Sequence, residues 1–88
     1  MNLGDTATTA AGLVSKDRNA TYGYPDEDFQ RTVDLYRTLT GISLTPAQGM
    51  LFMICVKLSR EANAHKSDNL IDLCGYADCM NWTLEKGA

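Results

Sequence analysis

The sequence lacks a long apolar run, an excess of basic charge and a second histidine, and each absence excludes a class of protein. No run approaches the roughly 20 apolar residues that cross a bilayer, so we predict no transmembrane helix. Eight basic and eleven acidic residues give a net charge of −3, which argues against a protein that coats nucleic acid through a basic face. One histidine and three cysteines without zinc-finger spacing argue against a zinc site.

The chain is short, and its 88 residues are the length of one small domain. A domain of this size buries only about 60–65% of the surface that its unfolded chain exposes, so a monomer would be marginally stable. Its 44% of apolar and 22% of charged residues are typical of a globular protein. Residues 1–9 lack the basic start and the apolar block of a signal peptide. We therefore expect a cytoplasmic protein without membrane contact.

Helix-start and helix-stop signals predict four helices within a single domain over residues 1–88. Pro25 suits a first helical position, and Gly41 is typical of a residue just past a helix end. Thr45 with Gln48 three positions later has the pattern of a capping box. We expect a weak helix over 1–16 and main helices over 25–40, 45–64 and 67–86.

The helix expected over 45–64 is apolar on every face along residues 50–56. A helix that is apolar all round must be surrounded by protein. A chain of 88 residues can hardly surround it alone, so we expect a second subunit to cover part of it. The predicted fold is all-α: a small antiparallel helical bundle completed by homo-oligomerisation through this helix.

Polar side chains collect where the last two predicted helices meet. Lys57 and Glu61 lie four residues apart, and Glu61 and His65 repeat that spacing. Asp68 and Asp72 have the same spacing on the next helix. Residues four apart share a helical face, and the short turn makes the two helices antiparallel neighbours. We therefore expect these faces to lie near each other.

Two interpretations of this cluster stay open. In the first, carboxylates on the facing helices hold Mg²⁺, while Lys57 and Arg60 meet the phosphate oxygens of a ligand. In the second, Lys57 and Glu61 form an ordinary ion pair within one helix. Asp68 would then only favour the positive end of the helix dipole.

Asp72 has a less ordinary position than the other acids of the cluster. It stands between Ile71 and Leu73, so we expect it to face a partly buried groove. A buried carboxylate needs a partner. The candidates are Arg60, Lys57 and a metal ion.

The segment of residues 18–25 carries an arginine and two tyrosines directly before a predicted helix. In one interpretation it is a lid, in which Tyr22 or Tyr24 stacks on a nucleotide base and Arg18 contributes to substrate binding. In the other, the two tyrosines simply pack the loop against the bundle.

Several short patterns occur in a fixed order over about Val14 to Met80, which is most of the chain. They are Asp17-Arg18, Tyr22-Gly23-x-Pro25, Lys57-x-x-Arg60 and Asp68-x-x-x-Asp72-x-x-Gly75. Together they resemble small helical proteins encoded by bacteriophages and prophages. That group is similar to a distant, shortened branch of the MazG-like, all-helical nucleoside triphosphate pyrophosphatases. The resemblance implies oligomers that hold Mg²⁺ through a Glu-Glu-x-x-Glu motif and through acidic residues on the next helix.

The resemblance transfers to this chain at some positions and fails at others. Asp68 and Asp72 match the second acidic motif, and Glu61 matches the last glutamate of the first motif. The resemblance implies that these three hold the metal and that Asp72 and Glu61 are catalytic. Lys57 and Leu58 stand where the other two glutamates would be. A lysine there removes a metal ligand and adds a positive charge beside the ion.

Three functions are compatible with these patterns. The first is a Mg²⁺-dependent nucleotide pyrophosphatase or hydrolase of the MazG-like type. The second is a non-catalytic protein that sequesters a nucleotide or a nucleotide-derived host-defence signal. The third and weakest is an oligomeric interaction module. For the first two, the predicted substrate-binding residues are Lys57, Arg60, Tyr22, Tyr24 and Arg18.

Overall fold

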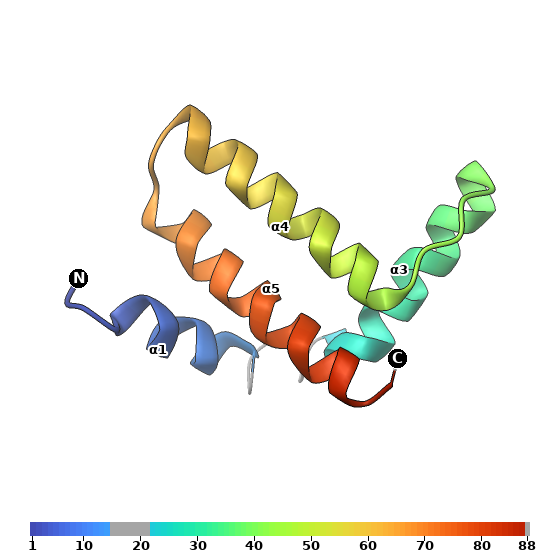
Figure 1. The fold of residues 1–88 in the computed structure, drawn as a ribbon, viewed down its shortest axis with the longest axis horizontal. Coiled ribbons are helices and arrows are strands. Elements are labelled where there is room, and N and C mark those ends of the chain that lie inside the picture. The colour runs from blue at the N-terminus through green and yellow to red at the C-terminus, as the bar shows by residue number, and fades with distance from the viewer. Residues whose placement is uncertain (15–21, 88) are drawn as a thin grey trace.

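The computed structural model describes residues 1–14 and 22–87, and over these ranges it contains helices and no strand. The predicted all-helical class is confirmed. The helices expected over 25–40, 45–64 and 67–86 are seen with ends that shift by at most one residue. The helix expected over 1–16 begins at Asp5, and residues 15 and 16 lie outside the described ranges. In chain order they are α1 (Asp5–Gly12), α3 (Pro25–Thr40), α4 (Pro46–Asn63) and α5 (Ser67–Glu85) (Figure 1).

The helices form an antiparallel hairpin with one helix on its side and one across its end. α4 and α5 run antiparallel and make the most extensive contact in the molecule (Figure 1). α1 packs along α5, and α3 crosses the beginning of α4 and then extends away from the hairpin. The hairpin therefore holds the polar residues of interest between two neighbouring helices.

The signals read from the sequence set the ends of these helices. The Thr45 hydroxyl accepts a hydrogen bond from the Gln48 amide at 3.1 Å, and the Gln48 side chain accepts one from the Thr45 amide at 2.9 Å. This capping box satisfies two amides at the start of α4. Gly41 adopts a left-handed φ of 77° after α3, a conformation that glycine reaches without strain.

The core lies where α3, α4 and α5 meet. Phe29, Met50, Tyr76 and Cys79 form its buried cluster, and Met50 is fully enclosed. The rings of Phe29 and Tyr76 meet edge to face, with centroids 6.1 Å apart. Gly49 lets α3 approach closely, so these few contacts set the position of α3 on the hairpin.

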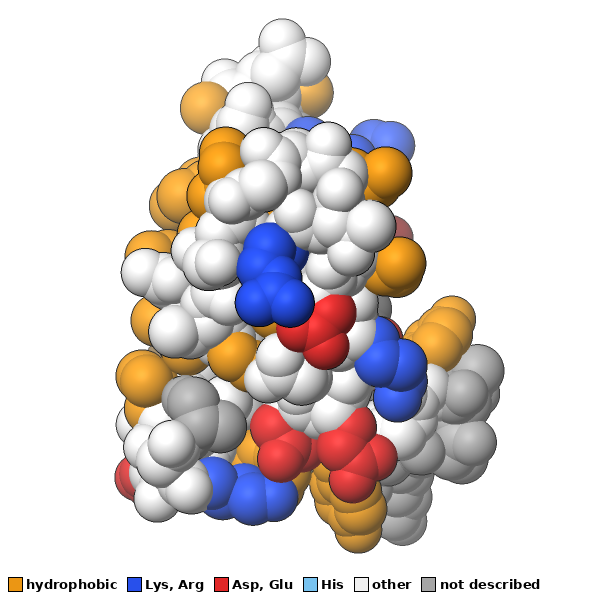
Figure 2. Space-filling model, turned by 90° about the vertical axis from the view of Figure 1, so that its right-hand side faces the viewer, with side chains coloured by type: hydrophobic (Ala, Val, Ile, Leu, Met, Phe, Trp, Pro, Cys, Tyr) orange, Lys and Arg blue, Asp and Glu red, His pale blue; other side chains and the backbone are white. Residues whose placement is uncertain are grey.

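Much apolar surface stays outside this core. Phe52 on α4 is 65% exposed, and Leu39 on α3 is 83% exposed. Figure 2 looks onto the end of the molecule where α3 and the C-terminus lie: charged side chains of both signs face the viewer, and hydrophobic side chains gather along its left edge. The single chain therefore leaves α4 only partly covered, and completion by another subunit stays a prediction.

Across residues 1–14 and 22–87, no helix combines the length and the apolar character needed to cross a bilayer.

Candidate functional site

An ion pair between Lys57 and Asp72 joins α4 to α5. Nζ of Lys57 lies 2.8 Å from Oδ2 of Asp72, and the two side chains are only 14% and 26% exposed. A carboxylate that is largely removed from water needs such a partner. Of the three partners that the sequence left open for Asp72, the structure shows Lys57. Among the described residues Lys57 makes no ion pair with Glu61.

Glu61 is engaged by the turn that follows α4. Its carboxylate accepts hydrogen bonds from Nδ1 of His65, from the Lys66 amide at 2.9 Å and from the Asn69 side chain at 3.2 Å. The hydrogen bond from His65, and after it the one from the Lys66 amide, lowers the pKa of Glu61. Glu61 therefore fixes the turn between α4 and α5 as a carboxylate.

Three charged residues near this turn make no side-chain contact of this kind with the part of the chain that the structure describes. Arg60, Lys66 and Asp68 are exposed, and none of their side chains makes a hydrogen bond or an ion pair within the described ranges. Arg60 follows Lys57 by three residues, which places both cations on neighbouring positions of one helical face. Lys57, which is paired with Asp72, and the exposed Arg60 therefore lie close together on α4.

Two of the three carboxylates expected to hold Mg²⁺ have protein partners in the described chain, and the Mg²⁺ site stays a prediction. Mg²⁺ requires near-ideal octahedral geometry with oxygen ligands. Both oxygens of Glu61 accept hydrogen bonds from the turn, and Asp72 is paired with Lys57. Over residues 1–14 and 22–87, no group of three His, Cys, Asp or Glu side chains is placed to share an ion.

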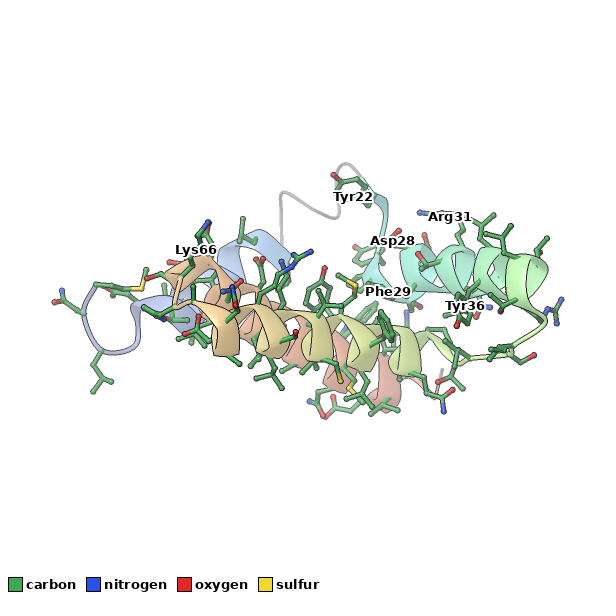
Figure 3. All side chains as sticks on the ribbon, turned by 90° about the horizontal axis from the view of Figure 1, so that it is seen from above. Tyr22, Asp28, Phe29, Arg31, Tyr36 and Lys66 are labelled. Atoms are coloured by element: carbon green, nitrogen blue, oxygen red, sulfur yellow. The ribbon has the colours of Figure 1, made fainter. Side chains whose placement is uncertain are left out.

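The predicted aromatic residues lie in another part of the molecule. Tyr24 stacks on Trp82, with ring centroids 5.8 Å apart and planes 21° from parallel. Trp82 follows Asp72 by ten residues on α5, about 15 Å along the helix axis. In Figure 3, Lys66 lies at the turn of the hairpin, whereas Tyr22 lies near the start of α3. Arg18, the remaining predicted substrate-binding residue, lies outside the described residues.

Two hollows differ in size and in chemistry. Asp72 lines a small one of about 10 Å³ between α1 and α5, together with Gly75 and Val14, which is too small for a nucleotide. A groove of about 380 Å³ lies between α3 and α4, and its lining is uncharged: Phe29, Thr32, Val33, Tyr36, Leu44, Gly49, Phe52, Met53 and Tyr76.

The chain is similar to proteins associated with bacteriophages. Residues 5–83 match a family described as a domain of unknown function, DUF6378. The chain belongs to this family. It is 27% identical over 78 residues to the Gene 55 protein of Mycobacterium phage D29, an alignment that covers 88% of this chain and 52% of that protein. The chain thus spans about half the length of this phage relative. No solved structure matches it.

The phage association predicted from the sequence is confirmed by these findings, and the finer MazG-like relation stays a prediction. The sequence analysis did not identify two residues of this DUF6378 member whose side chains join separate parts of the chain. Asn69 is buried and donates a hydrogen bond to Glu61. The only sign of this role in the sequence was its position in the first turn of the last predicted helix. Lys86 lies over the Trp82 ring at 4.3 Å and pairs with Asp26 at 3.0 Å. That contact joins residues 60 apart, so no local pattern could reveal it.

Proposed function

We propose that this DUF6378 protein handles a phosphate-bearing nucleotide, and that it binds the nucleotide without hydrolysing it. In a phage-type protein, such binding would sequester a nucleotide or a nucleotide-derived host-defence signal. The observation that carries the proposal is the ion pair of Lys57 with Asp72. Lys57 occupies the position where the MazG-like resemblance would place a metal-binding carboxylate. An ammonium group in that place attracts phosphate directly.

The chemistry of the two cations on α4 suits a phosphate group. An ammonium has three N–H donors, and Asp72 is the one partner that the structure shows for Lys57 among the described residues. The guanidinium of Arg60 offers five further donors in a planar fork that matches phosphate oxygens. Asp72 holds the Lys57 ammonium in place between the helices, while Arg60 reaches the ligand from solvent.

Hydrolysis is the second candidate, with Mg²⁺ as its cofactor. It is supported by the MazG-like resemblance and by Asp68, an exposed carboxylate one turn before Asp72 without a partner in the described chain. Against it stand the partners of the other two carboxylates, since Glu61 is bound to the turn and Asp72 to Lys57. We therefore rank binding above turnover.

The test mixes the purified protein with a panel of nucleoside triphosphates and cyclic nucleotides, once with Mg²⁺ and once with EDTA. Anion-exchange chromatography then separates bound, free and cleaved nucleotides. A nucleotide that is retained with EDTA and released intact on denaturation supports binding. If a monophosphate and pyrophosphate form only with Mg²⁺, the protein hydrolyses the nucleotide, and the proposal of binding without hydrolysis is wrong. If every nucleotide stays free and intact, the proposal is wrong and an interaction module becomes the better description.

Variants locate the site on α4. Arg60→Ala should weaken affinity for the retained nucleotide about tenfold or more, because a charge-assisted hydrogen bond is lost. Arg37→Ala on α3 is the matched control, since it removes the same charge from an exposed helical position, and it should leave affinity unchanged. Equal losses in both variants would show that only net charge matters and would refute this site.

Asp72→Asn separates the two candidates further. Removing a negative charge beside Lys57 should leave anion binding intact or strengthen it. If the protein were a metal-dependent hydrolase, the same change would abolish turnover. Isothermal titration of wild type and variant with the retained nucleotide, in EDTA, measures the first outcome, and a lost affinity would contradict binding through Lys57.

A further inference from the structure

We infer that a second copy of this chain covers the groove between α3 and α4. This inference is independent of the proposed nucleotide function, because the groove contains neither Lys57 nor Arg60. It also refines the oligomer expected through residues 45–64, since it places α3 in the interface together with α4.

The first argument is the amount of surface that the chain exposes. Its accessible surface is 5960 Å² for a mass of 9.7 kDa. A compact monomer of that mass is expected to expose about 5,100 Å². The excess is about 800 Å², which is the area that each partner contributes to a standard protein–protein interface.

The second argument is where this surface lies. The radius of gyration is 13.5 Å, against about 12 Å expected for a compact domain of this length. α3 forms one end of the molecule, and its far end stands away from the hairpin (Figure 1). Leu35 and Leu39 on that far end are 65% and 83% exposed, and Phe52 on the facing part of α4 is 65% exposed.

The third argument is the pattern along α3. Phe29, Thr32, Val33 and Tyr36 line the groove, and Leu39 continues their stripe at the next helical position. Figure 3 shows Phe29 and Tyr36 on the side of α3 that faces α4, with Arg31 on the other side. One helix therefore carries both a wall of the groove and an apolar end that extends beyond it.

This arrangement favours a copy of the same chain over a different protein. A two-fold axis lets each chain place its projecting α3 residues against the groove of the other, so one surface complements itself. Each copy has a net charge of −3, and two such copies repel unless charge is kept out of their contact. All nine lining residues are uncharged. The Thr32 hydroxyl already donates to the Asp28 carbonyl at 3.0 Å, so burying it leaves no donor unsatisfied.

Sedimentation equilibrium of the full chain tests the inference from low to high micromolar concentration. Wild type should have twice the mass of the 9.7 kDa chain. Phe52→Glu on the α4 wall of the groove and Leu39→Glu on α3 just beyond the groove should both give the mass of a single chain. Both residues are largely exposed in the single chain, so the variants should keep their helical circular dichroism.

Leu3→Glu is the matched control, because Leu3 is fully exposed at the end of the molecule remote from α3. It should keep the wild-type mass. A monomeric wild type would overturn the inference, and so would a Leu39→Glu variant that associates as wild type does. Neither result bears on nucleotide retention, which is measured separately with the Arg60→Ala variant.

Discussion

The α4–α5 hairpin and α3 are both helical, but they are held in different ways. The hairpin is joined by polar contacts across its two helices, namely the Lys57–Asp72 ion pair and the hydrogen bonds of Glu61. α3 is held at its beginning by apolar contacts and by the Lys86–Asp26 ion pair, and its far end exposes Leu35 and Leu39.

This difference shows which helices are positioned by contacts within the single chain. Directional polar contacts fix the register of two helices, and the hairpin needs no further partner for it. Apolar contacts stabilise in proportion to the area they bury, so a helix that buries only one end remains incompletely stabilised. The hairpin is therefore suited to hold a polar site, whereas α3 is suited to form an interface.

The largest expected effect comes from the residue that joins both regions. Met50 is fully buried between α3, α4 and α5, so Met50→Ala should lower the free energy of unfolding by about 2–5 kcal/mol. Urea denaturation followed by circular dichroism measures it. Leu84→Ala, at a half-exposed position of α5, should cost less than about 1 kcal/mol. Equal costs would show that the core does not lie where the three helices meet.

A smaller effect tests the contact between α3 and the hairpin. A Cβ atom at Gly49 would lie 3.1 Å from both Phe29 and Val33, and Val33 is buried and stiff. Gly49→Ala should therefore destabilise by about 1–2 kcal/mol despite the better helix propensity of alanine. Gly12→Ala in α1, where a Cβ meets nothing within 4 Å, should stabilise by up to about 1 kcal/mol. A stabilised Gly49→Ala would mean that α3 moves freely on α4.

The smallest expected effect concerns the hydrogen bonds of the Glu61 carboxylate in the hairpin. The pKa of Glu61 is lowered in the folded chain, first by the hydrogen bond from His65. Its carboxylate therefore contributes stability that is complete above its ordinary value of 4.5 and is lost as the pH falls through the lowered pKa. The urea midpoint of wild type should fall between pH 6 and pH 3 by more than that of Glu61→Gln.

The control for this pH dependence is Glu27→Gln, which removes an exposed carboxylate from α3. It should keep the wild-type decline. If Glu61→Gln declined as steeply as wild type, the turn between α4 and α5 would not depend on the Glu61 carboxylate.

The sequence predicted the local elements well because their signals are local. The proline at residue 25, the capping box at Thr45 and the glycine at residue 41 each act on amides and carbonyls within one turn. The weak helix expected over 1–16 begins only at Asp5, and residues 15 and 16 lie outside the described residues. Spacing also placed Glu61 and His65 together, and the structure shows their hydrogen bond.

The pairing of the candidate site was predicted only in part. The spacing of Lys57 and Glu61 allowed an ion pair within one helix, but Lys57 pairs with Asp72 across the hairpin. Sequence spacing gives the face of each residue but not the distance between two helices. That distance decides which of two carboxylates a lysine reaches.

The sequence by itself determined the helices and the phage-family patterns, because capping, helical periodicity and residue order require only neighbouring residues. Only the tertiary structure decided that Asp72 pairs with Lys57 and that Glu61 binds the turn between α4 and α5. It also decided that the far end of α3 extends beyond the hairpin, with an apolar groove between α3 and α4. These features depend on how closely the helices approach one another. Contacts between distant parts of the chain set that distance, such as those of Gly49 with α3.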